Sequence, residues 1–267
     1  MKRLVWLTDL HLEFVSSSIK ISNLCKRIKA AKPDYVLIGG DTGIANSVVQ
    51  YLLTLEEQLQ LPIYFVLGNH DFYHGSIEAV RRKVEALSRE SQRLNWLPIT
   101  GIVKLTDNAA LIGHDGWADG RLGNNINSRV ELNDYHLIKE LIEPDIIKRF
   151  KKLNMLGDKA ARYFQQILPQ ALKQYRNIFL LTHVPPFRIA CTYRGKISDD
   201  DYLPHFSSKS VGDMLIEIMK QHPESNLTVL CGHTHGKAEV RILSNLYVNT
   251  GSAEYGKPKI QEVFEIQ

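Results

Sequence analysis

Five short segments of the chain combine Asp, His and Asn in the way that divalent metal sites require. They are Asp9-Leu10-His11, Gly40-Asp41, Gly68-Asn69-His70-Asp71, His183-Val184-Pro185-Pro186 and Gly232-His233-Thr234-His235. Carboxylates, imidazoles and an amide oxygen without a thiolate suit Mn, Fe, Zn or Ni in an open site better than a closed structural zinc. The seven candidate ligands are Asp9, His11, Asp41, Asn69, His183, His233 and His235. Seven ligands are too many for one ion and indicate two ions that share a bridging carboxylate.

Each of these segments directly follows a short apolar run that is typical of a buried strand. The runs cover residues 4–7, 35–38, 63–67, 178–181 and 227–230, and a further run covers residues 109–112. Helical spacing separates them at about residues 19–31, 46–59, 77–93 and 210–221, which predicts βαβ units and a largely parallel sheet. Ligands of such sheets bind beyond the carboxyl ends of the strands, so the five segments should converge.

We expect residues 1–267 to form a single α/β domain, and the rest of the chain fits this interpretation. Residues 238–266 contain short strand patterns and predict a second, more antiparallel sheet. A helical pattern over about residues 133–175, with breaks expected at Pro144 and Pro169, predicts a helical insertion in this domain. Residues 118–129 are polar and rich in Gly and Asn, and we expect a loop there.

Composition and charge narrow the class of protein. Hydrophobic residues make up 44% and charged residues 23% of the chain, which excludes disorder and coiled coil as the main state. A formal net charge of +4 is small for a protein dedicated to duplex DNA. The three cysteines form no C-x-x-C pair, and no apolar segment has the length of a signal peptide or a membrane span. We therefore expect a cytoplasmic protein without a membrane partner.

Each of these segments, taken alone, could also be a purely structural feature. A single His after a strand is most often a hydrogen-bonded loop residue, Gly-Asp is a common turn, and Asn-His-Asp could cap a following helix. Five such fragments in order, each after a strand, favour the metal site over five coincidences. No P-loop, G-x-S-x-G or H-E-x-x-H segment occurs, which leaves nucleotide triphosphatase, serine hydrolase and zincin activities without support.

The order of the segments resembles the signature of the calcineurin-like metallophosphoesterases. The similarity spans residues 9–235 and implies an αββα sandwich of two packed mixed sheets flanked by helices, with a dinuclear metal site at the strand ends. Carried over position by position, the resemblance gives the first metal Asp9, His11 and His235. It gives the second metal Asn69, His183 and His233, with Asp41 bridging both. His70 would be the catalytic residue that faces the substrate without binding metal.

The resemblance also implies an activity. We expect hydrolysis of a phosphodiester or phosphomonoester by attack of a metal-bound hydroxide, with His70 protonating the leaving oxygen or stabilising the transition state. The cofactors would be two divalent ions, with Mn²⁺ expected and Fe, Zn or Ni as alternatives. The substrate would be a small, nucleotide-like phosphoester and not nucleic acid. Residues 42–46 lack the arginine of the protein Ser/Thr phosphatases, which disfavours phosphoprotein.

Two other functions remain open at this stage: a nuclease of the same family, and a non-catalytic scaffold on the same fold. Asp71 would orient either His70 or a neighbouring loop. His114 and Asp115 also follow an apolar run, and a wall or supporting role is expected for His114. Further substrate contacts are expected among the loop residues Arg121, Asn124, Arg129, Tyr193 and Arg194.

Overall fold

The first of two mixed β-sheets holds the amino-terminal third of the chain in this computed structural model, which describes residues 1–267. Its strand order is β13-β1-β2-β3-β4. The parallel strands are β1 (Lys2–Leu7), β2 (Tyr35–Gly39), β3 (Ile63–Val66) and β4 (Leu94–Trp96). The last strand of the chain, β13 (Glu262–Ile266), pairs antiparallel with β1 and closes the edge.

The second sheet has the strand order β11-β12-β10-β7-β6-β5. Its four parallel strands are β6 (Ala109–Gly113), β7 (Asn177–Leu181), β10 (Asn226–Cys231) and β12 (Leu246–Thr250). The edges, β5 (Val103–Lys104) and β11 (Ala238–Leu243), run antiparallel to their neighbours. A separate small hairpin joins β8 (Thr192–Tyr193) and β9 (Lys196–Ile197).

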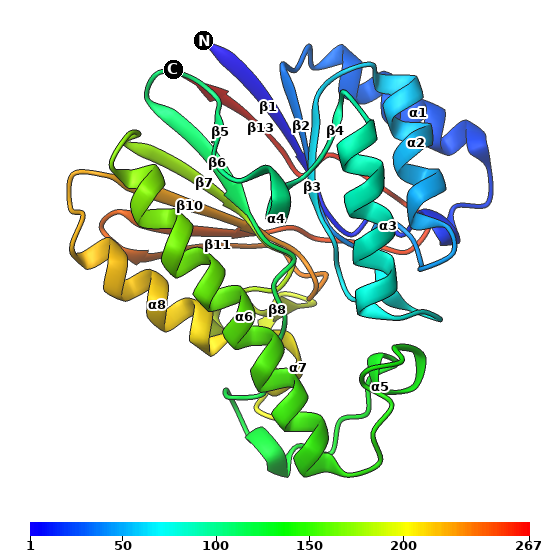
Figure 1. Ribbon diagram of the computed structural model, residues 1–267, viewed down its shortest axis with the longest axis vertical. Coiled ribbons are helices and arrows are strands. Elements are labelled where there is room, and N and C mark those ends of the chain that lie inside the picture. The colour runs from blue at the N-terminus through cyan, green and yellow to red at the C-terminus, as the bar shows by residue number, and fades with distance from the viewer.

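Helices cover the outer face of each sheet (Figure 1). The first sheet carries α1 (Ser18–Ala30), α2 (Val48–Leu59) and α3 (Ile77–Glu90), and the second carries α6 (Ile146–Leu172) and α8 (Lys209–Lys220). Short helices lie in the connections: α4 (Leu97–Thr100), α5 (Asp134–Leu137) and α7 (Leu203–Phe206), with 3₁₀ turns η1 (Leu12–Phe14), η2 (His70–Phe72), η3 (Asn125–Asn127) and η4 (Arg188–Ala190). None of these helices is both long and apolar enough to span a bilayer.

The inner faces of the two sheets pack directly against each other. Trp6 and Leu37 of the first sheet share one buried cluster with Leu111 and Leu230 of the second. Aromatic rings also meet across the interface, since the Phe179 and Phe264 centroids lie 5.4 Å apart. Separate clusters join each sheet to its own helices. The predicted αββα sandwich of two mixed sheets is therefore confirmed.

Three details differ from the expectation. Strands β4 and β5 were not predicted, because three and two residues are too few to show a pattern. The tail does not form a sheet of its own: β11 and β12 extend the second sheet, and β13 crosses back to the first. Pro169 does not break α6, since it lies in the last turn, where the ring costs a single main-chain hydrogen bond.

The segment predicted as a helical insertion contains α5 and α6. It begins just after the loop that carries η3 and connects β6 to its parallel neighbour β7. Ala160, Phe164 and Leu168 of α6 are fully buried against the second sheet. The preceding residues leave the sandwich and extend beyond the carboxyl ends of the strands, where Figure 1 places α5 at the lower end of the molecule.

Candidate metal centre

The loops that follow the strands bend sharply at the residues predicted as ligands. The backbone is left-handed at Asp9 (φ 51°), His11 (φ 43°), Asp41 (φ 52°), His233 (φ 72°) and His235 (φ 59°). This conformation costs L-residues about 1–2 kcal/mol each and gathers at functional sites. Here it turns five side chains away from their strand directions and toward the seam between the two sheets.

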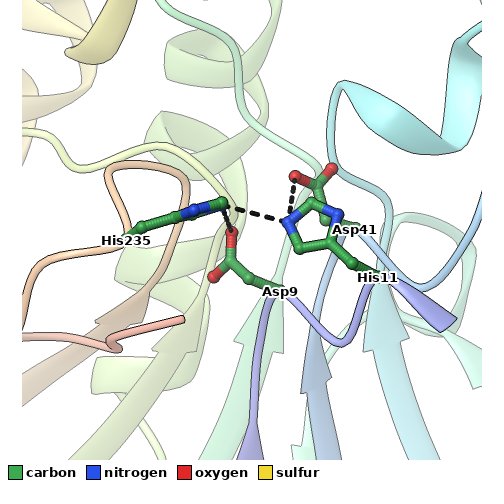
Figure 2. Close-up of side chains that lie close together, drawn as sticks. All are labelled: Asp9, His11, Asp41 and His235. Carbon is green, nitrogen blue, oxygen red and sulfur yellow. Dashed lines mark hydrogen bonds and ion pairs between the residues drawn. The ribbon is translucent and has the colours of Figure 1, made fainter. Parts of the chain in front are cut away.

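A first group of side chains meets at this seam, with Asp9, His11 and Asp41 from the first sheet and His235 from the second (Figure 2). Their possible ligand atoms all lie within 4.8 Å of one another. The Nε2 atoms of His11 and His235 are 3.0 Å apart. Nε2 of His235 lies 3.7 Å from Asp9 Oδ1, and Nε2 of His11 lies 3.7 Å from Asp41 Oδ2.

A second group forms around the amide of Asn69. Its Oδ1 lies 3.1 Å from Nε2 of His183 and 2.9 Å from Nδ1 of His233. Nε2 of His183 is also 3.4 Å from Oδ2 of Asp41. One oxygen of Asp41 therefore faces both groups, and the structure brings together all seven side chains that the sequence analysis selected.

The protons on the second group can be located from their partners. Nδ1 of His183 lies 2.9 Å from the Gly39 carbonyl, and Nε2 of His233 lies 3.0 Å from the His205 carbonyl. A carbonyl oxygen only accepts, so these nitrogens carry protons. The neutral His233 ring then presents a bare nitrogen on its other side, and His183 would do so once a cation displaced its second proton. Those other nitrogens face the Asn69 oxygen. Lone pairs that converge in this way fit a divalent cation.

The charges of the side chains at the seam also favour binding of a cation there. Burial opposes ionisation of Asp41, but His183, His70 and His11 together hold the pKa of this carboxyl well below its usual range. Burial would lower the pKa of His183, but neighbouring Asp41 raises it to about 10. Burial lowers the pKa of His233 to about 4, so this ring is neutral at pH 7. The ionised Asp41 carboxylate therefore attracts a positive charge, either a proton on His183 or a cation, to the space between its Oδ2 and Nε2 of His183.

The ligand-type side chains are held by the loops around them. Asp9 accepts hydrogen bonds from the His233 backbone N–H at 2.9 Å and from the Thr8 hydroxyl at 2.8 Å. Oδ1 of Asp41 accepts the His70 backbone N–H at 2.9 Å. At Gly68 any side chain would overlap Asp41, so close packing of these loops requires glycine there.

His70 lies beside the two groups, and Glu13 lies behind it. The His70 ring stacks on Tyr73 with centroids 4.2 Å apart, and its Nδ1 is 3.5 Å from Glu13 Oε1. The same oxygen is 3.6 Å from Nδ1 of His11, and neither Glu13 oxygen has a hydrogen-bond partner. Burial would raise the pKa of Glu13, but the two histidines lower it to about 2. The spacing Asp9, His11, Glu13 was the available sequence signal for this residue, which was missed.

Of its two expected roles, Asp71 fills the one in which it orients a neighbouring loop, because its hydrogen bonds go to loop N–H groups and not to His70. Its Oδ1 accepts the backbone N–H groups of Thr42 and Gly43, each at 2.9 Å. Its Oδ2 accepts the N–H of Gly68 at 2.9 Å. This carboxyl therefore fastens the loop after β2 to the loop after β3.

A cavity of about 640 Å³ opens over the seam. Asp41, Asn69, His70, His233 and His235 line one side of it. Tyr193 is the one residue of the other walls that was expected from the sequence. These walls also contain Tyr73, Leu132, Asn133, Asp134, Lys196, Ile197, Ser198, Asp199, Tyr202, Phe206, Thr234 and Tyr255. These residues come from loops far apart in the chain and carry no local pattern that could have revealed them.

Other expected contacts lie outside this cavity. His114 is buried against Tyr163, with ring centroids 5.1 Å apart, and does not line the cavity, so of its two expected roles only the supporting one agrees with the structure. Asp115 accepts hydrogen bonds from Arg81, Trp96 and the Leu67 backbone, each at 2.9 Å, which makes it a structural residue.

The remaining four candidates for substrate contact do not line the cavity either. Arg121 pairs with Asp119 and Asp158, and Asn124 donates to Asp201 at 2.7 Å. Arg129 is exposed, and the Arg194 guanidinium lies 5.1 Å from the centroid of the Tyr193 ring. The cavity lining therefore gives these four expectations no support, since exposed loop residues carry no directional signal.

Comparisons with known proteins agree with this geometry. An uncharacterized protein from Acanthamoeba polyphaga mimivirus is 23% identical over 248 residues, which cover 88% of this chain and 85% of that protein. Among solved structures, phosphopantetheinyl hydrolase from Mycobacterium tuberculosis has a TM-score of 0.66 at 15% identity, covering 95% of this chain and 90% of the other. A dimetal phosphatase from Danio rerio has a TM-score of 0.59 at 13% identity, covering 94% and 87%.

The family comparison is decisive. Calcineurin-like phosphoesterase sequences match residues 2–237, a range that includes every ligand-type side chain described above. The structural similarities extend the same fold over nearly the whole chain. The family uses divalent metals to hydrolyse phosphoesters, which agrees with a cluster of Asp and His side chains at the sheet ends. The chain belongs to the calcineurin-like phosphoesterase family.

Proposed function

We propose that this protein hydrolyses a phosphodiester or phosphomonoester bond in a small molecule, using two divalent ions, with Mn²⁺ as the expected metal. Asp9, His11 and His235 would hold one ion, Asn69, His183 and His233 the other, and Asp41 would bridge them. The observation that carries this proposal is the position of Asp41, whose Oδ2 lies 3.7 Å from His11 and 3.4 Å from His183. Both groups also border one cavity.

The bound ions would supply an activated water and neutralise charge on the phosphoryl oxygens. The protein would contribute a proton donor, for which His70 is the candidate. In the metal-free protein burial would lower the pKa of His70, but the carboxylates of Asp41, Glu13 and Asp134 raise it overall. A positioned acid contributes about 10²–10⁴-fold to the rate by protonating the leaving oxygen.

The cavity walls support a small organic substrate with a planar or apolar group. Tyr193, Tyr202, Phe206 and Tyr255 give these walls aromatic surface on which a base or a similar ring could stack. About 640 Å³ is within the range of small-molecule sites and is compatible with a nucleotide-like compound.

The two alternative functions have less support. A nuclease would need several cationic side chains along its groove, and Lys196 is the one lysine or arginine in the cavity wall. A non-catalytic scaffold would leave no reason to keep buried carboxylates and histidines at a strained seam. Three free and buried cysteines support a reducing compartment such as the cytoplasm.

The test is hydrolysis by chelated protein before and after addition of Mn²⁺. We expect restored activity on bis-p-nitrophenyl phosphate or p-nitrophenyl phosphate, and little on phosphoserine peptide or single-stranded DNA. His183→Ala should abolish the activity, whereas His136→Ala, a change at a histidine 64% exposed and outside the cavity, should leave it unchanged. Faster cleavage of DNA or phosphopeptide than of either small ester, or metal-independent activity, would contradict the proposal.

A further inference from the structure

The nitrogen of the Asn69 amide, on the side away from the two histidines' contacts with its oxygen, has its own partner. This nitrogen, Nδ2, donates to Oδ1 of Asp134 at 2.8 Å, and the Tyr73 hydroxyl donates to the same oxygen at 2.7 Å. Asp134 is 5% exposed and stands at the start of α5, 65 residues along the chain from Asn69. A segment outside the sandwich therefore contacts one of the proposed metal ligands from behind.

The orientation of the Asn69 amide decides whether its oxygen or its NH₂ group faces His183 and His233. With its oxygen toward His233, Asn69 presents a lone pair to the bare Nδ1 of that ring at 2.9 Å. A turn of the amide by 180° would present N–H there and form a hydrogen bond with no ion present. The contact with His233 therefore favours the reversed amide, which cannot bind a metal because an amide nitrogen carries no lone pair to share. Nε2 of His183, 3.1 Å from the same oxygen, favours the oxygen only while that ring is protonated.

Asp134 opposes that reversal. A carboxylate only accepts, so it can hold Nδ2 but would repel the oxygen of a reversed amide. The Tyr73 hydroxyl fixes the carboxylate in turn, and all three side chains are buried. No other acceptor contacts Nδ2 more closely, since the Tyr73 oxygen lies at 3.3 Å.

We propose that Asp134 is a positioning residue that locks the Asn69 amide with its oxygen toward the metal centre, so that the segment carrying α5 controls the affinity of the ion held by Asn69, His183 and His233. This inference rests on the proposed function, because it assumes that Asn69 is a ligand. It assigns a role in metal binding to a segment that lies outside the two sheets.

The experiment compares Mn²⁺ binding by Asp134→Leu, Asp134→Ala and Asp134→Asn, measured by calorimetry and elemental analysis. Loss of a carboxylate behind a metal ligand costs about 10- to 100-fold in metal affinity. We expect that loss at one of two ions in the Leu and Ala variants. The Asn variant keeps an oxygen that can accept from Nδ2, so it should recover most of the affinity. Asp107→Leu is the control, since it removes a carboxylate that is 91% exposed and pairs with Lys104, and it should leave Mn²⁺ affinity unchanged.

A second measurement does not depend on hydrolysis or on bound metal. In metal-free protein labelled with ¹⁵N, the Nδ1 signal of His233 should move in Asp134→Leu or Asp134→Ala, because the released amide reverses and donates to it. Wild-type affinity for both ions in the Leu and Ala variants would overturn the inference, as would an unmoved Nδ1 signal or equal weakening of both ions. If wild-type protein bound no ion, the proposed function would fail, and the ¹⁵N signal would still decide the orientation of the amide.

Discussion

Replacing Glu13 with glutamine tests whether the carboxylate behind His70 supports catalysis. Oε1 of Glu13 lies 3.5 Å from Nδ1 of His70 and 3.6 Å from Nδ1 of His11, with no hydrogen-bond partner of its own. These distances are too long for formed hydrogen bonds and leave charge as the main interaction. Glutamine keeps the shape and removes that charge.

The size of the effect can be bounded. Two unit charges about 4 Å apart attract by about 4 kcal/mol at an intermediate dielectric, which limits the loss to about 10³-fold. The Glu13 side chain is 14% exposed, so solvent weakens the attraction below this limit. Carboxylate partners of functional histidines are worth about 10- to 100-fold. We therefore expect turnover to fall 10- to 100-fold, with little change in KM.

The assay measures kcat and KM of Glu13→Gln on two phosphoesters, one with a nitrophenol and one with an alkyl alcohol as leaving group. An alcohol needs protonation more than nitrophenol does, so a loss that acts through His70 should be larger on the alkyl ester. Glu254→Gln is the matched control, since its carboxylate pairs with Lys257 at 2.6 Å and is 67% exposed. His70→Ala sets the largest expected loss.

Metal content separates the two histidines that Glu13 faces. If the variant keeps both ions and still loses turnover, the effect acts through His70. Turnover within twofold of wild type on both esters would refute the reasoning, because the charge would then support neither ring. Loss that is fully restored by excess Mn²⁺ would assign the carboxylate to His11 alone.

Three further changes have defined outcomes. Asp41→Ala should release both ions by elemental analysis whereas His235→Ala releases one, and two ions retained without Asp41 would contradict a bridging carboxylate. Chelation should lower Tm by about 10–20 °C, because each of the two ions, at about 100 times its Kd, adds about 2.7 kcal/mol to a site made by both sheets, and an unchanged Tm would exclude such a link. His114→Asn should make the free energy of unfolding less sensitive to acid. Burial lowers the pKa of His114 from 6.5 to about 4, so as pH falls from 6.5 to 4 the unfolded chain binds the proton before the folded protein does. Wild type should lose about 2 kcal/mol more than the variant between pH 7 and pH 5 in denaturant titrations, and equal losses would show that His114 does not contribute.

The sandwich and the ligand-type residues were predictable because their signals are local. Runs such as residues 63–67 are continuous and apolar, and in each case the candidate ligands follow within five positions of the end of the run. Parallel strands then bring those positions to one edge without any further information. The same locality explains why Asp9 and His235 could be selected from opposite ends of the chain.

The cavity walls and the supporting residues were not predictable for the opposite reason. Asp134 reaches Asn69 through a connection whose path depends on how α6 packs on the second sheet. Tyr255 packs on His11, with ring centroids 4.6 Å apart, because β13 returns to the first sheet, a crossing that the tail pattern does not encode. Contacts of this kind depend on tertiary packing and leave no periodic trace in the sequence.

The left-handed backbone at five ligand-type positions lowers the stability of the fold that carries the site. Five residues at about 1–2 kcal/mol each amount to about 5–10 kcal/mol, as large as the net stability of many domains. Glycine would relieve most of that cost at every one of these positions and would remove a proposed metal ligand. Laboratory evolution for heat resistance alone should therefore collect glycines at these turns first, and only a parallel demand for turnover would keep the aspartates and histidines in place.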